Sequence, residues 1–167
     1  MGMPKHLLRT QLHCAKDYAL GKVKEEPLGS NRGFWVEEFQ EDAGINPGDA
    51  WCAAGVYSCH EEACDMQRIS VPFLKRTGWC KGQWLYALKQ PRLGILSAKD
   101  IIEDKKQIPD GAIWIRYADD GTGHTGFVFD HDPDKNELKS IEFNCGNQAD
   151  VRVYIISNIP DFKGVII

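Results

Sequence analysis

The spacing of apolar residues changes at one point in this chain, the turn Pro109-Asp110-Gly111. Before this turn apolar residues recur at helical spacing, as in residues 3–24, where Gly21 marks the end of the pattern. After it they alternate with a period of two, which is typical of half-buried strands. Because the helices precede the strands, the sequence predicts an α+β fold with helices packed against one face of a sheet.

The expected elements form a single domain over residues 1–167, a length that suits one well-buried core. It divides into an N-terminal helix in 1–24, a helical half in 25–108 and a sheet half in 109–167. Helices are expected at 3–24, 34–43, 52–67, 84–89 and 97–105, the last with Ser97 as its N-cap. Strands are expected at 112–117, 125–130, 137–144, 151–157 and 165–167. Short turns at 119–123 and 132–136 predict that this sheet of about five strands is mostly antiparallel.

Composition excludes several classes of protein. The net charge of −4 gives no electrostatic basis for binding nucleic acid. No apolar run is long enough to cross a membrane, and residues 1–20 lack the apolar core of a standard signal peptide. We therefore expect a monomeric protein that is made in the cytoplasm. If it acts outside the cytoplasm, we expect it to get there by a route other than a standard signal peptide. Its six cysteines are too sparse for a disulfide scaffold, and Cys52, Cys59 and Cys64 lack the paired spacing of structural zinc sites.

A cysteine stands at the expected start of the helix in 52–67. Gly48 breaks the chain before it, Asp49 is expected to be the N-cap, and Cys52 falls on the apolar face with Val56 and Cys59. A helix N-terminus stabilises a thiolate, because its unpaired N–H groups and its dipole favour negative charge. Cys52 is therefore either a nucleophile or a buried structural cysteine.

A nucleophilic thiol needs a base to hold its proton and a third group to orient that base. His124 opens a strand between Gly123 and Gly126, which either leave room above its ring or mark a bulge. We expect His60 on the polar side of its helix and His131 in a solvated turn. His124 is therefore the histidine expected to act as the base.

The following strand supplies the third group. Alternation over 137–144 places Glu142 and Asn144 on one face, with Ile141 and Phe143 on the other. A carboxylate among apolar neighbours needs a partner, and an imidazole on the adjacent strand would be one. Asn144 could instead hold the ring or the substrate, and Glu142 could simply face water from an edge strand.

These segments together resemble, in order, the CHAP family of cysteine, histidine-dependent amidohydrolase/peptidase domains, which is related to the NlpC-like and papain-like cysteine peptidases. The resemblance runs from about residue 10 to the C-terminus and is specific only as a set. It rests on Glu26-Pro27, Gly29-Ser30-Asn31-Arg32-Gly33, Val36-Glu37, Trp51-Cys52-Ala53-Ala54, Pro109-Asp110-Gly111, Gly123-His124-Thr125-Gly126 and Ile141-Glu142-Phe143-Asn144.

The resemblance implies a papain-like fold in which Cys52 is the nucleophile, His124 the base and Glu142 the residue that orients it. Asn144 would be a supporting polar group, and Trp51 and Asp49 would flank the nucleophile as supporting residues. Phe143 departs from the family, because many relatives have glycine there, and this leaves the roles of Glu142 and Asn144 open.

Some relatives bind calcium through acidic residues just upstream of the cysteine. Asp42, Asn46 and Asp49 occupy that region here, but they do not form a calcium-loop pattern. We therefore expect no metal and no other cofactor.

The activity that the resemblance implies is hydrolysis of an amide bond in bacterial peptidoglycan, either at the N-acetylmuramoyl-L-alanine link or within the stem or cross-bridge peptides. A lone catalytic domain of this kind resembles a small phage or prophage endolysin, which acts at the bacterial cell wall. The alternatives are a secreted antibacterial toxin that degrades the wall, a peptidase acting on proteins, and a non-catalytic structural or binding module of a phage.

Overall fold

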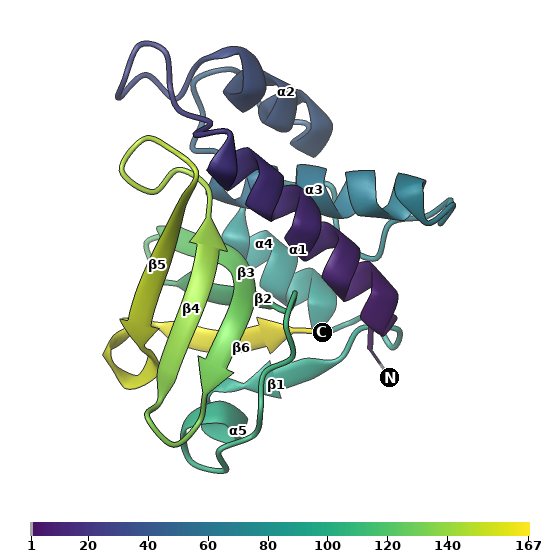
Figure 1. Ribbon diagram of the computed structural model, residues 1–167, viewed down its shortest axis with the longest axis vertical. Helices are drawn as coiled ribbons and strands as arrows, with labels where there is room; N and C mark the ends of the chain where they lie inside the picture. The colour runs from purple at the N-terminus through teal and green to yellow at the C-terminus, as the bar shows by residue number, and fades with distance from the viewer. Residues whose placement is uncertain (1) are drawn as a thin grey trace.

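The computed structural model describes residues 2–167 and has an α+β fold, in which α1, α3 and α4 lie on one side of a curved sheet (Figure 1). The expected α+β class is confirmed, although one strand, β1, precedes the last α-helix, α5, in the chain. The helices are α1 (Lys5–Leu20), α2 (Phe34–Ala43), α3 (Cys52–Met66), α4 (Cys80–Ala87) and α5 (Ala98–Ile102), with a 3₁₀ turn η1 (Ile156–Asn158).

The described residues form a six-stranded sheet in the order β1-β6-β2-β3-β4-β5, and every neighbouring pair is antiparallel. Five strands lie close to the expected positions, and the sixth, β1, was not predicted. The strands are β1 (Ile95–Ser97), β2 (Ile113–Tyr117), β3 (Gly123–Asp132), β4 (Glu137–Glu142), β5 (Asp150–Ile155) and β6 (Phe162–Ile166).

Local sequence explains most helix ends. Gly44 takes the left-handed conformation (φ 71°) after α2, where glycine is favoured. Ser97 caps α5 as predicted, and its hydroxyl accepts a hydrogen bond from the backbone N–H of Asp100. The predicted start of α4 was wrong by four residues, because this helix begins at Cys80 and not at Trp84. That earlier start places a second cysteine at the first position of a helix.

The sheet has a hydrophobic core on each face. Ile115, Phe127 and Ile141 point toward the helices and belong to the larger core, which also includes Leu7 of α1. Trp114 and Val128 and Leu138 belong to a smaller core on the other face, closed by residues of α5 and η1. Alternate residues of β2, β3 and β4 are therefore buried on opposite sides. Within residues 2–167, none of the helices is long and apolar enough to cross a bilayer.

Candidate active site

Cys52 is the first residue of α3 and is buried, with 6% of its surface exposed. The expected N-cap at Asp49 is wrong, because the helix begins later and Trp51 is the N-cap residue. The Asp49 carboxylate instead accepts a hydrogen bond from the backbone N–H of Asn46 at 2.9 Å. The first N–H groups of a helix have no intrahelical acceptor, and in α3 no N-cap side chain bonds to them either. This arrangement suits a site that binds negative charge.

Trp51 anchors the start of α3 through a buried polar network. Its indole N–H donates to the Glu25 carboxylate at 2.9 Å, and Glu25 also accepts from the backbone N–H of Asn31 at 3.0 Å. The Gln40 amide donates to the backbone carbonyls of Asn31 and Asp49 at 2.9 and 2.7 Å. These bonds fix the segment that leads into Cys52, so Trp51 holds the start of α3 in place from within the core.

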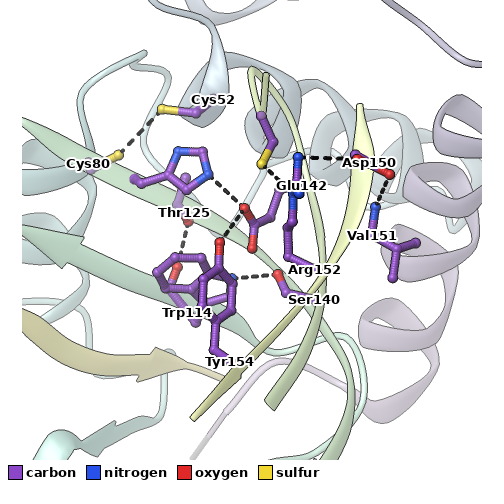
Figure 2. Close-up of polar contacts among 12 residues, drawn as sticks. Cys52, Cys80, Trp114, Thr125, Ser140, Glu142, Asp150, Val151, Arg152 and Tyr154 are labelled. Atoms are coloured by element: carbon purple, nitrogen blue, oxygen red, sulfur yellow. Dashed lines mark hydrogen bonds and ion pairs between the residues drawn. The ribbon is translucent and has the colours of Figure 1, made fainter. Parts of the chain in front are cut away.

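His124 and Glu142 form a hydrogen-bonded ion pair across β3 and β4. The distance from His124 Nε2 to Glu142 Oε2 is 2.8 Å, and the Glu142 side chain is completely buried. Glu142 Oε2 also accepts from the Tyr154 hydroxyl at 3.0 Å, as Figure 2 shows. Glu142 therefore does not face water from an edge strand. Because Nε2 is committed to the carboxylate, Nδ1 is the ring nitrogen that remains for a proton exchange with Cys52.

Gly126 allows Glu142 to reach His124. The two residues Gly126 and Glu142 are paired directly in the β3–β4 ladder, and His124 lies two residues along on the same face. A Cβ atom on Gly126 would lie 2.7 Å from Glu142 Cγ and 2.7 Å from Ser140 Oγ. The irregularity in this ladder falls further on, between Val128 and Asp130. The glycine therefore makes room for the carboxylate and does not mark a bulge.

Trp114 supports the imidazole from β2. Its ring contacts the His124 ring edge-on, with centroids 5.7 Å apart, and also contacts Tyr154. The indole N–H donates to Ser140 Oγ at 2.6 Å, which fixes the ring between β2 and β4 (Figure 2). The histidine is therefore held by an aromatic neighbour as well as by the carboxylate.

The electrostatics favour a thiolate–imidazolium pair. A hydrogen bond from Cys80 and the neighbouring His124 hold the pKa of Cys52 well below its usual range, although burial opposes this. Burial lowers the pKa of His124, but Cys145, Cys52 and Glu142 outweigh it and raise that pKa to about 11. The pKa of Cys80 is raised by its contact with Cys52 and by burial, so Cys80 stays a neutral thiol that donates.

Asn144 lies elsewhere than the alternation predicts. β4 ends at Glu142, and Asn144 has a left-handed backbone (φ 55°), so it does not continue the strand. Its amide donates to Asn31 Oδ1 at 3.1 Å, and the carboxylate of Glu142 is the group bonded to His124. Phe143 is fully buried and points toward the helices, where its ring lies against Gly55 of α3. Phe143 is thus part of the core that sets the distance between α3 and the sheet.

Two histidines expected at the surface are buried, and those predictions were wrong. His60 is fully buried, with Nδ1 2.7 Å from Gln11 Oε1, and its Nε2 accepts from the backbone N–H of Phe73 at 3.0 Å. His131 is 6% exposed and its Nδ1 accepts from the backbone N–H of Ile108. Both have tertiary partners far away in the sequence, which a local pattern does not reveal.

One group of side chains in the site carries metal-ligand atoms close together. The donor atoms of His124, Glu142 and Cys145 lie within 4.8 Å of one another. A metal there would have to displace the proton shared by His124 and Glu142, and also the Arg152 guanidinium, which donates to Cys145 Sγ at 2.9 Å. Among the acidic residues upstream of Cys52, Asp42 accepts a hydrogen bond from the Ser58 hydroxyl at 2.6 Å.

Several residues of the site were not predicted from the sequence, and Trp114 is one of them. Glu25 accepts a hydrogen bond from Trp51, and Tyr154 donates one to Glu142. Each bond joins segments that are separated in the sequence. Cys80 lies with its sulfur 3.9 Å from that of Cys52. A signal for Cys80 was present, because Trp79-Cys80 repeats the Trp-Cys pair that begins α3.

Comparison of the chain with protein-family models, with curated proteins and with solved structures finds no significant match.

Proposed function

We propose that this protein is a cysteine amidohydrolase or peptidase that cleaves an amide bond in bacterial peptidoglycan. The observation that carries the proposal is the buried His124–Glu142 ion pair beside a cysteine at a helix N-terminus. A thiolate, an imidazolium and an orienting carboxylate are the three parts that nucleophilic cysteine catalysis needs. The geometry supports the proposed chemistry, and the resemblance to CHAP domains supports the proposed substrate class.

In the proposed mechanism the Cys52 thiolate attacks the amide carbonyl and forms a tetrahedral intermediate. Its oxyanion accepts from backbone N–H groups at the start of α3, including that of Cys52. The His124 imidazolium donates its proton to the departing amine, which leaves an acyl-enzyme. Neutral His124 then takes a proton from water, whose oxygen attacks the thioester and releases the acid and the thiolate.

Glu142 acts in this scheme through His124. Its carboxylate fixes the ring so that Nε2–H points at Oε2, and it stabilises the charged imidazolium. The Tyr154 hydroxyl orients the carboxylate in turn. Burial and the Glu142 charge raise the pKa of Tyr154, so its hydroxyl stays protonated and keeps donating.

The biological setting that we propose is a small phage or prophage endolysin acting at the cell wall. A secreted toxin that degrades the wall would use the same chemistry. A non-catalytic structural module would have no need for a buried carboxylate paired with a histidine, because removing both charges from water is costly and such a pair adds little to stability.

The test is hydrolysis of purified peptidoglycan, with casein as the control substrate. We expect fragments from peptidoglycan, and mass spectrometry of those fragments identifies the bond that is cut. Cys52→Ala should abolish the activity, whereas Cys64→Ala, a buried cysteine on the same helix, should keep most of it. Full activity of Cys52→Ala would end the assignment of the nucleophile, and cleavage of casein alone would end the assignment of the substrate.

A further inference from the structure

Two cysteines begin two helices and meet beside the proposed catalytic pair. Cys52 is the first residue of α3 and Cys80 the first residue of α4, and each follows a tryptophan. Their sulfur atoms are 3.9 Å apart, and a dashed line joins the two labelled residues in Figure 2. Both cysteines are buried, with 6% and 4% of their surfaces exposed.

The proposed hydrolysis does not require a second thiol at this place. Cys80 donates a hydrogen bond to the Cys52 sulfur, and a hydroxyl could do the same. What a thiol adds is redox chemistry, because a thiol next to a reactive thiolate can condense with its oxidised form. Cys52 has the properties of such a reactive thiolate, since Cys80 and His124 lower its pKa.

Cys80 is also held in place beside Cys52, because it packs against the start of β3. A Cβ atom on Gly123, the residue before His124, would lie 2.9 Å from Cys80 Cβ and 3.4 Å from its sulfur. Cys80 therefore packs directly on the backbone of β3. The two sulfurs must close from 3.9 Å to about 2.05 Å to form a disulfide, which requires rotation of the two short side chains.

The other cysteines are less suited to pair with Cys52. Cys59 and Cys64 lie further along α3, about 10 and 18 Å from Cys52 along the axis at 1.5 Å per residue. Cys14 is buried in α1, where burial and the charge of Glu62 raise the pKa of its thiol to about 12. Cys145 is near His124, but its sulfur accepts a hydrogen bond from Arg152.

We propose that Cys80 is the resolving cysteine of Cys52, so that a peroxide converts the pair into a reversible Cys52–Cys80 disulfide. The Cys52 thiolate attacks one oxygen of hydrogen peroxide, which breaks the O–O bond and gives a sulfenic acid and hydroxide; the His124 imidazolium gives its proton to the hydroxide, which becomes the first water. The Cys80 sulfur then attacks the Cys52 sulfur and displaces its hydroxyl, while the Cys80 proton completes the second water. Two thiols and one peroxide thus become one disulfide and two waters, and a dithiol reductant returns the two electrons.

The disulfide would block the nucleophile and protect it from irreversible oxidation. That loss of activity rests on the proposed function, but formation of the disulfide does not. The experiment therefore has two readouts, the mass of the protein and its activity. If the disulfide forms in a protein that has no hydrolase activity, the proposed function fails and this inference stands.

The test treats the full chain with hydrogen peroxide and then with dithiothreitol. We expect the intact mass to fall by about 2 Da, and a non-reducing digest to yield a peptide that links Cys52 to Cys80. Dithiothreitol should restore the mass and most of the activity. In Cys80→Ser the linked peptide should be absent, Cys52 should proceed to sulfinic acid, and less than about a tenth of the activity should return.

Cys145→Ser is the matched control, because it removes the other cysteine near His124 and should still form the disulfide. Cys80→Ala repeats the test if the serine variant does not fold, and the digest of the wild-type protein needs no variant. A bond from Cys52 to Cys145, sulfinic acid at Cys52 in the wild type, or no change at peroxide concentrations that oxidise a model thiol would each overturn the proposal.

Discussion

Glu142 is the residue on which the geometry of the proposed triad depends most. Its carboxylate is fully buried and accepts from His124 and Tyr154, whereas its Oε1 atom has no hydrogen-bond partner among the described residues. A buried carboxylate is costly unless it is paired, so the fold retains this charge only because His124 carries the opposite one. The same interaction raises the pKa of His124 and so keeps the imidazolium available.

We predict that Glu142→Gln lowers kcat about 10–1,000-fold and changes KM less. The amide keeps the size of the side chain but removes the charge that stabilises the imidazolium. His124 is active while protonated, so activity is present below its pKa of about 11 and is lost above it. Without the charge that pKa falls, and the alkaline limb of the pH profile of kcat/KM should move to lower pH.

Asn144→Ala is the comparison for that variant. Asn144 bonds to Asn31 and not to His124, so its loss should weaken the connection to the 25–33 loop and cost less activity. If Asn144→Ala is the less active enzyme, and Glu142→Gln keeps its turnover and its pH profile, then the third member of the triad is Asn144.

Metal chelation separates thiolate catalysis from a metal centre at the same residues. His124, Glu142 and Cys145 carry donor atoms within 4.8 Å, yet no step of the proposed mechanism uses a metal ion. We predict that peptidoglycan hydrolysis is unchanged after treatment with EDTA and removal of the chelator. If EDTA abolishes the activity, if zinc restores it, and if Cys145→Ser is inactive even with zinc, the residues form a metal centre. If calcium restores the activity instead, the metal site is at Asp42, Asn46 and Asp49.

The sequence predicted individual site residues where a local rule applied. The positions of Cys52 in the first turn of a helix and of Glu142 on the face of its strand opposite Ile141 and Phe143 follow from spacing alone. The burial of His60 could not be predicted, because its partner Gln11 is 49 residues away. The direction of Asn144 also could not, because the left-handed backbone at that residue interrupts the alternation.

Among the elements, the contact between α3 and the sheet determines where Cys52 lies. Gly55 faces Phe143, and the Phe143 ring is enclosed by the rings of Phe39, Trp51 and Tyr18, with centroids 5.4–6.4 Å apart. A large side chain on the strand is thus accommodated by a glycine on the helix. The residue that departs from the CHAP pattern therefore has its compensation in the first turn after Cys52.

We predict that Gly55→Ala lowers the free energy of unfolding by about 1–3 kcal/mol and lowers activity more strongly than its stability explains. An added Cβ would lie 2.6 Å from Phe143 Cδ1, and the enclosed ring cannot move aside, so α3 must shift away from His124. Urea unfolding and peptidoglycan hydrolysis measure the two effects. Phe143→Leu in the same protein should restore part of both.

Gly82→Ala in α4 is the matched control for that prediction. Its added Cβ would lie 2.7 Å from the Trp79 ring, but that side chain is half exposed and can turn away. We expect little change in stability, since alanine is the better helix former. Equal effects of the two substitutions would show that Phe143 does not set the position of α3.

The sequence predicted long, regular elements better than short ones. The bounds of α2 were predicted to the residue, because apolar and acidic side chains alternate at helical spacing between Gly33 and Gly44. β1 was missed because three residues are too few to show a period. The start of α4 was missed because Gly82 is a poor helix former and the helix has no capping side chain.

At the scale of the whole molecule, the proposed site joins two layers that fold from different parts of the chain. The helices, which Figure 1 shows on one side of the sheet, supply the thiols of Cys52 and Cys80. The sheet supplies His124 and Glu142. Activity therefore depends on how the layers are held together. One of the connections is the Gln11 side chain of α1, which contacts His60 of α3 and donates to the carbonyl of Gly111 before β2 at 2.7 Å.

His60 makes this connection sensitive to pH. Burial and the charge of Arg92 lower the pKa of His60 to about 3, from 6.5 in an exposed histidine. Between these values the unfolded chain binds a proton at His60 that the folded protein does not. The free energy of unfolding must therefore fall as the pH decreases from about 6.5 toward 3, by up to about 1.4 kcal/mol per pH unit.

We predict that His60→Gln lowers the stability at pH 7.5, because it disrupts the buried network, but makes the stability less dependent on pH. Urea unfolding at pH 7.5 and pH 5.0 measures this, and the loss on acidification should be about 2 kcal/mol smaller than in the wild type. His13→Gln is the control, because that side chain is 71% exposed and should leave the difference unchanged. The contributions of His124 and His131 are present in all three proteins and cancel in the comparison. If His60→Gln loses as much stability on acidification as the wild type, His60 is protonated in the folded protein, and the connection from α1 to the sheet does not depend on its neutral form.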